Sequence, residues 1–153
     1  MGMLFIVSTP IGNLDDITIR AQKTLASVDL ILCEDTRRTA HLVDDSKLLR
    51  FDEHTEDKLI PEILQLLAQK DIALVSDAGT PLISDPGFLL VREAIKRGIK
   101  VVSIPGASAV LAALTSSGLP ANKFLFLGYP PEKQSHRIKL FESLPKDTTI
   151  IFY

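Results

Sequence analysis

Residues 72–87 read IALVSDAGTPLISDPG, an apolar run that passes into a loop of small, polar and conformationally restricted residues. The run is continuous rather than alternating, which is typical of a strand buried on both faces of a parallel sheet. The loop 76–87 holds two glycines and two prolines, and it exceeds the about 2–6 residues of an ordinary connection. Ligands of such sheets bind beyond the carboxyl ends of the strands, so the loop predicts a binding site there. A well-capped loop without a ligand is the alternative.

The same apolar pattern recurs along the chain and alternates with segments of helical spacing. Further strands are predicted at residues 4–7, 30–33 and 101–104, with a shorter candidate at 48–51. Helices are predicted at 17–28, 60–67 and 107–117, and a fourth is expected to begin with Asp85 as N-cap and Pro86 in its first turn. This alternation predicts an α/β fold, a parallel sheet flanked by helices.

A second unit is predicted after Pro120, where apolar segments at 124–128 and 148–153 flank a polar, helix-like stretch. We therefore expect an N-terminal α/β domain at residues 1–119 and the beginning of a second α/β domain at 120–153. The last apolar, β-branched run reaches the final residue, whereas chain ends are usually polar and frayed. This second domain is accordingly expected to be truncated.

Composition narrows the classes of function. A net charge of −2 and a pI near 5.9 provide no basic field for nucleic acid, so any RNA contact must be local. The single cysteine, Cys33, excludes a disulfide framework, and with three scattered histidines it gives no metal-ligand spacing, so no metal site is predicted. Neither a membrane span nor an export signal is evident, and a cytoplasmic protein is expected.

Residues suited to chemistry follow the other predicted strands as well. Glu34, at the start of EDTRR, is predicted to accept a hydrogen bond from a ribose, to accept a proton, or only to belong to a helix N-cap neutralised by arginine. The turn PGAS at 105–108 indicates either close approach of another group or helix–sheet packing. Histidine is the residue type most often used as a general acid or base near neutral pH, so His54 is a candidate, but a solvated surface histidine is favoured. Arg20, Arg37 and Arg38 are candidate partners of phosphate or carboxylate.

Standard nucleotide-binding signatures are missing from the sequence. It contains no Gly-x-Gly-x-x-Gly and no Gly-Lys-Ser/Thr phosphate loop. A dinucleotide or nucleoside-triphosphate site of the usual kind is therefore disfavoured.

Three motifs in order carry a resemblance to a known family: STPIGNL at residues 8–14, CEDTR at 33–37 and SDAGTPLISDPG at 76–87. The similarity continues through PGASA at 105–109, SGLP at 117–120 and TIIFY at 149–153, and so covers essentially the whole chain. In these motifs the sequence resembles the ribosomal RNA small subunit methyltransferase I family of the tetrapyrrole methylase superfamily.

The resemblance implies two α/β domains, usually in a homodimer, that hold S-adenosylmethionine and transfer its methyl group to a cytidine 2′-oxygen of small-subunit ribosomal RNA. The residues implied to approach the cofactor are Pro10, Asp77, Ala78, Gly79, Thr80, Ile83, Ser84, Ala107 and Leu127. A carboxylate that accepts the hydroxyl proton would assist transfer, and Glu34 and Asp77 are the two candidates. Arg20, Arg37 and Arg38 are the candidates for contact with the RNA.

Two departures from the family accompany this resemblance. The connection 39–52 is shorter than in the family, so the third strand or its crossover is expected to be trimmed. The family's second domain also extends well beyond residue 153. Two alternatives stay open: a small-molecule acceptor such as a tetrapyrrole with the same fold and cofactor, and a non-catalytic module that binds nucleotides or anions.

Overall fold

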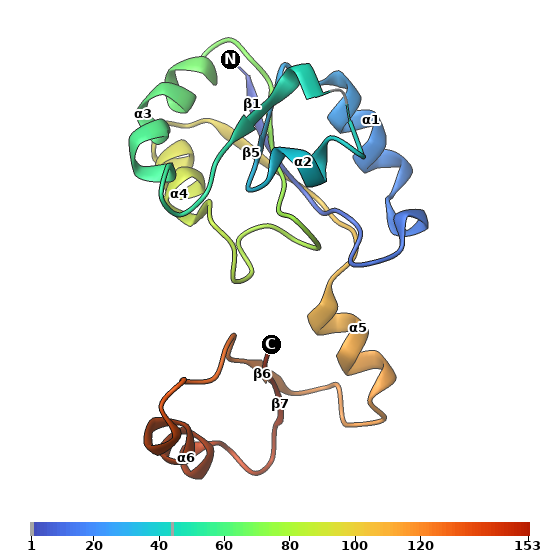
Figure 1. The fold of residues 1–153 in the computed structure, drawn as a ribbon, viewed down its shortest axis with the longest axis vertical. Coiled ribbons are helices and arrows are strands. Elements are labelled where there is room, and N and C mark those ends of the chain that lie inside the picture. Colours follow the sequence, from blue (N-terminus) through green and yellow to red (C-terminus); the bar gives the residue numbers. More distant parts are fainter. Residues whose placement is uncertain (1, 44) are drawn as a thin grey trace. The chain divides into compact units, whose positions relative to one another are not determined.

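The computed structural model describes residues 2–43 and 45–153 and divides the chain into two compact units, Met1–Ser108 and Ala109–Tyr153 (Figure 1). The division falls just before helix α5 (Ala109–Ser116), whereas the boundary expected from sequence follows that helix at residue 119. The assignment of 1–119 and 120–153 to two domains stays a prediction.

A five-stranded parallel sheet forms the centre of the first unit. Its strands are β1 (Met3–Val7), β2 (Leu30–Cys33), β3 (Leu48–Arg50), β4 (Ile72–Leu74) and β5 (Lys100–Ile104), in the order β3-β2-β4-β1-β5. All five predicted strands are confirmed to within one residue at either end. The short connection 39–52 leaves β3 in place, paired with β2 along its whole length. Because β1 lies between β4 and β5, the segments that follow these three strands are neighbours.

Helices cover both faces of this sheet. Helix α1 (Ile19–Ser27) lies on one face, and α3 (Glu56–Leu66) and α4 (Phe88–Lys96) lie on the other (Figure 1). Alternate residues of β4 enter different cores: Ile72 and Leu74 pack with α3 and α4, while Ala73 packs with α1. Successive strand side chains point to opposite faces, so a continuous apolar run is what a sheet covered on both sides requires.

The beginning of α4 differs from the prediction. The helix starts at Phe88 with Gly87 as its N-cap, at φ 115°, so the prediction that Asp85 caps it was wrong. Asp85 instead stays within the loop 76–87, where burial raises the pKa of its carboxyl. Its local cap signal therefore does not set the start of the helix.

The first unit also contains three short elements. They are η1 (Leu14–Asp16), α2 (Thr36–Thr39) and η2 (Asp45–Lys47), the first of which precedes α1. Helix α2 directly follows β2 and so presents its first turn at the carboxyl edge of the sheet.

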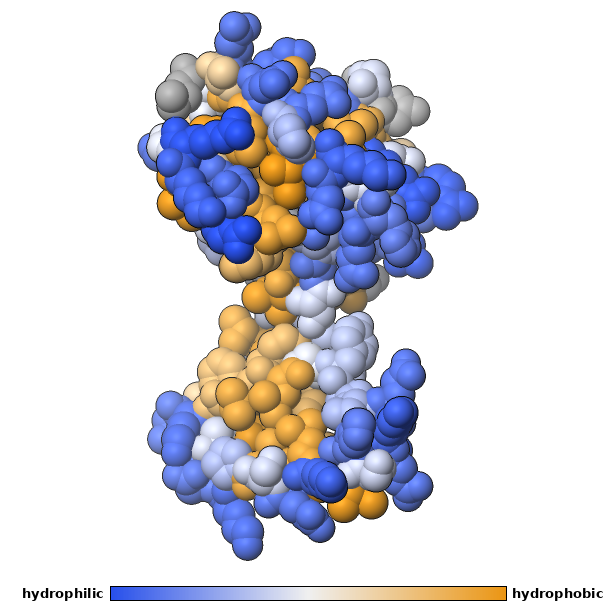
Figure 2. Space-filling model, turned by 90° about the vertical axis from the view of Figure 1, so that its left-hand side faces the viewer, coloured by the Kyte–Doolittle hydropathy of each residue, from blue (hydrophilic) through white to orange (hydrophobic). Residues whose placement is uncertain are grey.

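The second unit contains α5, β6 (Phe124–Phe126), α6 (Gln134–Ser143) and β7 (Thr149–Ile151), with β6 and β7 paired in parallel. The polar helix-like stretch is α6, as expected. Figure 2 shows hydrophobic residues gathered on the surface of this unit, and its exposed hydrophobic residues include Leu111, Leu119, Phe124, Ile138 and Phe141. A two-stranded sheet buries little apolar surface by itself, which accounts for this exposure.

Candidate functional site

The loop 76–87 is joined to the segment that follows β1. Thr9 and Gly79 form an antiparallel bridge, in which the Thr9 N–H donates to the Gly79 carbonyl at 2.9 Å and the Gly79 N–H donates to the Thr9 carbonyl at 3.1 Å. The Thr9 hydroxyl also donates to the Ser76 carbonyl at 3.2 Å. Gly79 has φ +82°, and a Cβ there would lie 3.2 Å from the Ile11 side chain. The path of the loop therefore requires glycine at this position.

Thr80 connects this loop to the segments that follow β1 and β5. Its hydroxyl donates to the Ala107 carbonyl at 3.1 Å and lies 2.9 Å from the Ser8 hydroxyl. A hydroxyl carries one hydrogen, so Ser8 is the donor in the second bond. A Cβ on Gly106 would lie 2.9 Å from the Ser8 Cβ, which identifies the close approach that the PGAS turn allows.

The far end of the loop is held under backbone strain. Leu82 and Ser84 have φ values of 72° and 66°, a left-handed region that costs a residue with a side chain about 1–2 kcal/mol. The Gly87 N–H donates to a carboxylate oxygen of Glu56 at 3.1 Å, which attaches the loop to the first turn of α3. The loop is thus held in one strained conformation at both ends, a feature that is common at functional sites.

Glu34 occupies the carboxyl end of β2, and its pKa is raised to about 7. Burial is the largest cause, and the negative charges of Asp85, Asp77 and Glu53 add to it, while the backbone N–H of Asp77 opposes the shift. Its Oε1 atom is buried and has no hydrogen-bond partner among the described residues. A carboxyl group of this kind exchanges a proton near neutral pH.

Asp35 and Asp77 are already engaged by other groups. Asp35 caps α2 by accepting from the Arg37 N–H at 2.9 Å and pairs with the Arg37 guanidinium at 3.0 and 2.7 Å, which lowers the pKa of its carboxyl to about 2. The N-cap hypothesis for EDTRR thus holds for Asp35. Asp77 accepts from the Asp35 N–H at 3.1 Å and lies 3.3 Å from Arg38 Nη1. Both oxygens of Asp77 therefore have partners, whereas Glu34 Oε1 has none among the described residues.

The other predicted site residues differ in their exposure to solvent. Pro10 is buried and Ala78, Ile83 and Ser84 are exposed in the loop segments, whereas Arg20 lies exposed in the first turn of α1. His54 is exposed, as the sequence favoured. Leu127 belongs to the second unit and is half-buried there. Cys33 is a free, buried thiol.

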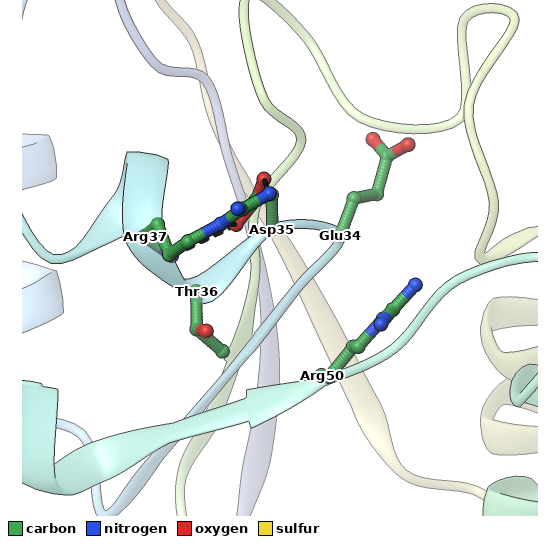
Figure 3. Close-up of a pocket in the computed structure, with 5 residues that line it drawn as sticks. All are labelled: Glu34, Asp35, Thr36, Arg37 and Arg50. Atoms are coloured by element: carbon green, nitrogen blue, oxygen red, sulfur yellow. Dashed lines mark hydrogen bonds and ion pairs between the residues drawn. The ribbon is translucent and has the colours of Figure 1, made fainter.

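A cavity opens at the ends of β2 and β3. It measures about 320 Å³ and is lined by Glu34, Asp35, Thr36, Arg37 and Arg50. Figure 3 shows Glu34 and Arg50 extending to the same side, while Arg37 lies along Asp35. Sequence reasoning missed Arg50, although it is the last residue of the short third strand and so stands at the same edge as the other candidates.

Among residues 2–43 and 45–153, no group of three or more His, Cys, Asp and Glu side chains is placed to hold a metal ion. No helix in this part of the chain is long and apolar enough to cross a bilayer.

Comparison with known proteins gives a consistent set of relatives. The family described as Tetrapyrrole (Corrin/Porphyrin) Methylases matches residues 3–153. A Thermotoga maritima protein named ribosomal RNA small subunit methyltransferase I is 51% identical over 100% of the chain and 71% of its own length. Its namesake from Mesorhizobium japonicum is 49% identical over 98% of the chain, which spans only 53% of that relative.

Solved structures share the fold at low identity. A diphthine synthase aligns with a TM-score of 0.76 at 16% identity, covering 99% of this chain and 64% of that one. A uroporphyrin III C-methyltransferase from Thermus thermophilus aligns with a TM-score of 0.62 at 20% identity, covering 84% and 59%. At these identities the likeness concerns the arrangement of helices and strands.

Proposed function

The chain belongs to the tetrapyrrole methylase family, and from that premise we propose that it transfers the methyl group of S-adenosylmethionine to a cytidine ribose 2′-hydroxyl of small-subunit ribosomal RNA. The observation that carries the proposal is the near full-chain similarity to relatives named for that RNA. Such an acceptor places the activity in the cytoplasm. Assembly as a homodimer, which the resemblance implies, is part of the proposal.

The strained loop is the part of the first unit that suits the cofactor. The exposed residues of this loop include Ala78 and Ser84, so ligand atoms there would meet backbone and small side chains. The residues proposed to hold the cofactor are Pro10, Asp77, Ala78, Gly79, Thr80, Ile83, Ser84 and Ala107. The family resemblance adds Leu127 as a further candidate. When bound, the cofactor supplies an electrophilic methyl group. The loop would hold it in a fixed orientation and exclude water.

Glu34 is the proton acceptor in this proposal, and Asp77 is a positioning residue. A carboxylate with a pKa near 7 and an unpartnered oxygen is suited to take the hydroxyl proton as the new C–O bond forms. Asp77 accepts a hydrogen bond from the Asp35 N–H and forms an ion pair with Arg38. These contacts attach the loop 76–87 to the end of β2.

Asp77→Asn tests this division of roles. Asparagine keeps an acceptor for the Asp35 N–H but loses the ion pair with Arg38, whose side chain is exposed, so we expect less than about 1 kcal/mol loss of stability. Methyl transfer should fall more than about tenfold, because misplacing a positioned group is costly. Turnover and thermal unfolding are measured side by side. If turnover falls only in proportion to the loss of stability, Asp77 has no role in the site beyond folding.

The function itself is tested by titrating S-adenosylmethionine and S-adenosylhomocysteine into the purified protein by calorimetry, beside a methylation assay on small ribosomal subunits. We expect binding of both compounds and a 2′-O-methylated cytidine in the RNA. Cofactor binding with methylation of a tetrapyrrole but not of RNA would indicate a small-molecule acceptor. Binding of neither compound would contradict the proposal.

A further inference from the structure

The cavity at the ends of β2 and β3 has no lining residue from the loop 76–87. Its walls come from the residues after β2 and from Arg50 at the end of β3, and at about 320 Å³ it lies at the lower limit of ligand pockets, roughly 300–1,000 Å³. It therefore suits one sugar–phosphate unit better than a whole cofactor.

Two arginines give this cavity unused donors. Arg50 uses Nε to bond Asp52 Oδ2 at 2.6 Å, and within the described part of the chain no hydrogen bond engages its terminal nitrogens. Arg37 uses Nε and Nη2 on Asp35. Both guanidiniums are held in place by an aspartate, and a guanidinium with a free edge binds phosphate through paired N–H groups.

The third feature of the cavity is Glu34. One of its oxygens is buried without a hydrogen-bond partner in the described chain, and buried polar atoms without partners are uncommon. The side chain extends to the same side as Arg50 (Figure 3). In RNA the 2′-hydroxyl and the 3′-phosphate stand on adjacent ribose carbons, so a carboxylate that faces the hydroxyl needs a cationic group beside it for the phosphate.

We propose that this cavity binds one ribose–phosphate unit of the acceptor RNA, with Arg50 pairing with the phosphate next to the hydroxyl that Glu34 faces. The inference rests on the proposed function and extends it to a residue outside the family motifs. It also answers how an acidic chain contacts RNA: the contact is local, through single arginines that aspartates orient.

The test is Arg50→Gln, with Arg92→Gln as the matched control. Arg92 is a partly exposed arginine of α4 that also pairs with a carboxylate, Glu93, and does not line the cavity. We expect Arg50→Gln to raise KM for small ribosomal subunits about tenfold, with a smaller change in kcat and unchanged calorimetric binding of S-adenosylmethionine. Between about 50 and 200 mM salt, the slope of log(1/KM) against log salt should flatten by about 0.7–1, the loss of one phosphate contact. Arg92→Gln should match the wild type.

The outcomes separate the two proposals. If the wild type methylates RNA and Arg50→Gln has the same KM and salt slope, the subsite is wrong and the function stands. A raised KM with an unchanged slope would mean that Arg50 does not meet a phosphate, and weaker cofactor binding would assign the cavity to the cofactor. Each overturns the inference. A wild type that does not methylate RNA removes the function and the subsite together.

Discussion

Replacing Glu34 by glutamine is expected to lower methyl transfer about 10²–10⁴-fold, the usual contribution of a positioned general base. Glutamine keeps the size and one acceptor oxygen but does not take a proton at neutral pH. Cofactor binding should stay within about twofold in this proposal, because the loop 76–87 and not Glu34 holds that ligand. Single-turnover rates and calorimetry give the two quantities, and loss of cofactor affinity equal to the loss of rate would contradict the role.

The pH dependence of the methyl-transfer rate tests the same role of Glu34 as proton acceptor. The pKa of Glu34 is raised to about 7, and the ionised form is the one that accepts a proton, so the wild-type rate should rise through pH 7 and level off above it. Burial is the largest cause of this raised pKa, and the negative charges of Asp85, Asp77 and Glu53 add to it; Arg50 lines the same cavity. Glu34→Gln should show a flat profile. A wild-type profile flat between about pH 5.5 and 8.5 would contradict the assignment.

As pH rises, the contribution of Glu34 to the free energy of unfolding should fall while the methyl-transfer rate rises. The folded pKa of Glu34 lies above the ordinary value of 4.5, so its protonated form favours the fold; that contribution is complete below pH 4.5 and is lost as pH rises through 7. At pH 8 Glu34→Gln should therefore be more stable than the wild type, by about 1 kcal/mol after allowance for solvent screening. Glu62→Gln, an exposed site on α3, is the control and should change little.

The strands were predictable because each carries its own signal. Residues 30–33 and 72–75 are apolar without interruption, and burial on both faces explains that pattern in physical terms. Once the strands are parallel, topology brings their carboxyl ends to one edge, so Ser8, Glu34 and Asp77 were expected together before any contact was known.

The contacts that assign roles were not predictable, because they join residues remote in sequence. Asp77 stays a predicted candidate base, and its bonds to Asp35 and Arg38, about forty positions away in the chain, are what favour a positioning role in the proposal. The raised pKa of Glu34 depends on burial by separate loops, which no local pattern encodes. Arg50 was overlooked because β3 is only three residues long and its charged end resembles ordinary surface.

Gly87→Ala should cause the largest loss of stability of any small change at this site. Gly87 has φ +115°, and a Cβ there would lie 2.4 Å from Leu74 Cδ2, in a core where Leu74 is 1% exposed. Backbone strain and overpacking each cost about 1–3 kcal/mol, so a loss of about 3–5 kcal/mol is expected. Thermal and urea unfolding measure it, and cofactor affinity should fall as well, because the displaced residue ends the loop.

Gly98→Ala separates the two causes. Gly98 also has a positive φ, +71°, but nothing lies within 4 Å of its missing Cβ, so only the backbone cost of about 1–2 kcal/mol remains. Shortening Leu74 to alanine should in turn make room beside residue 87, so the double variant should lose less than the two single losses added together. If the losses of the two single variants simply add, the side chain of Leu74 adjusts to a Cβ at residue 87 without a loss of stability. The close packing of Gly87 on Leu74 would then not be what fixes the end of the loop, and Glu56, which binds the Gly87 N–H, would be the remaining restraint.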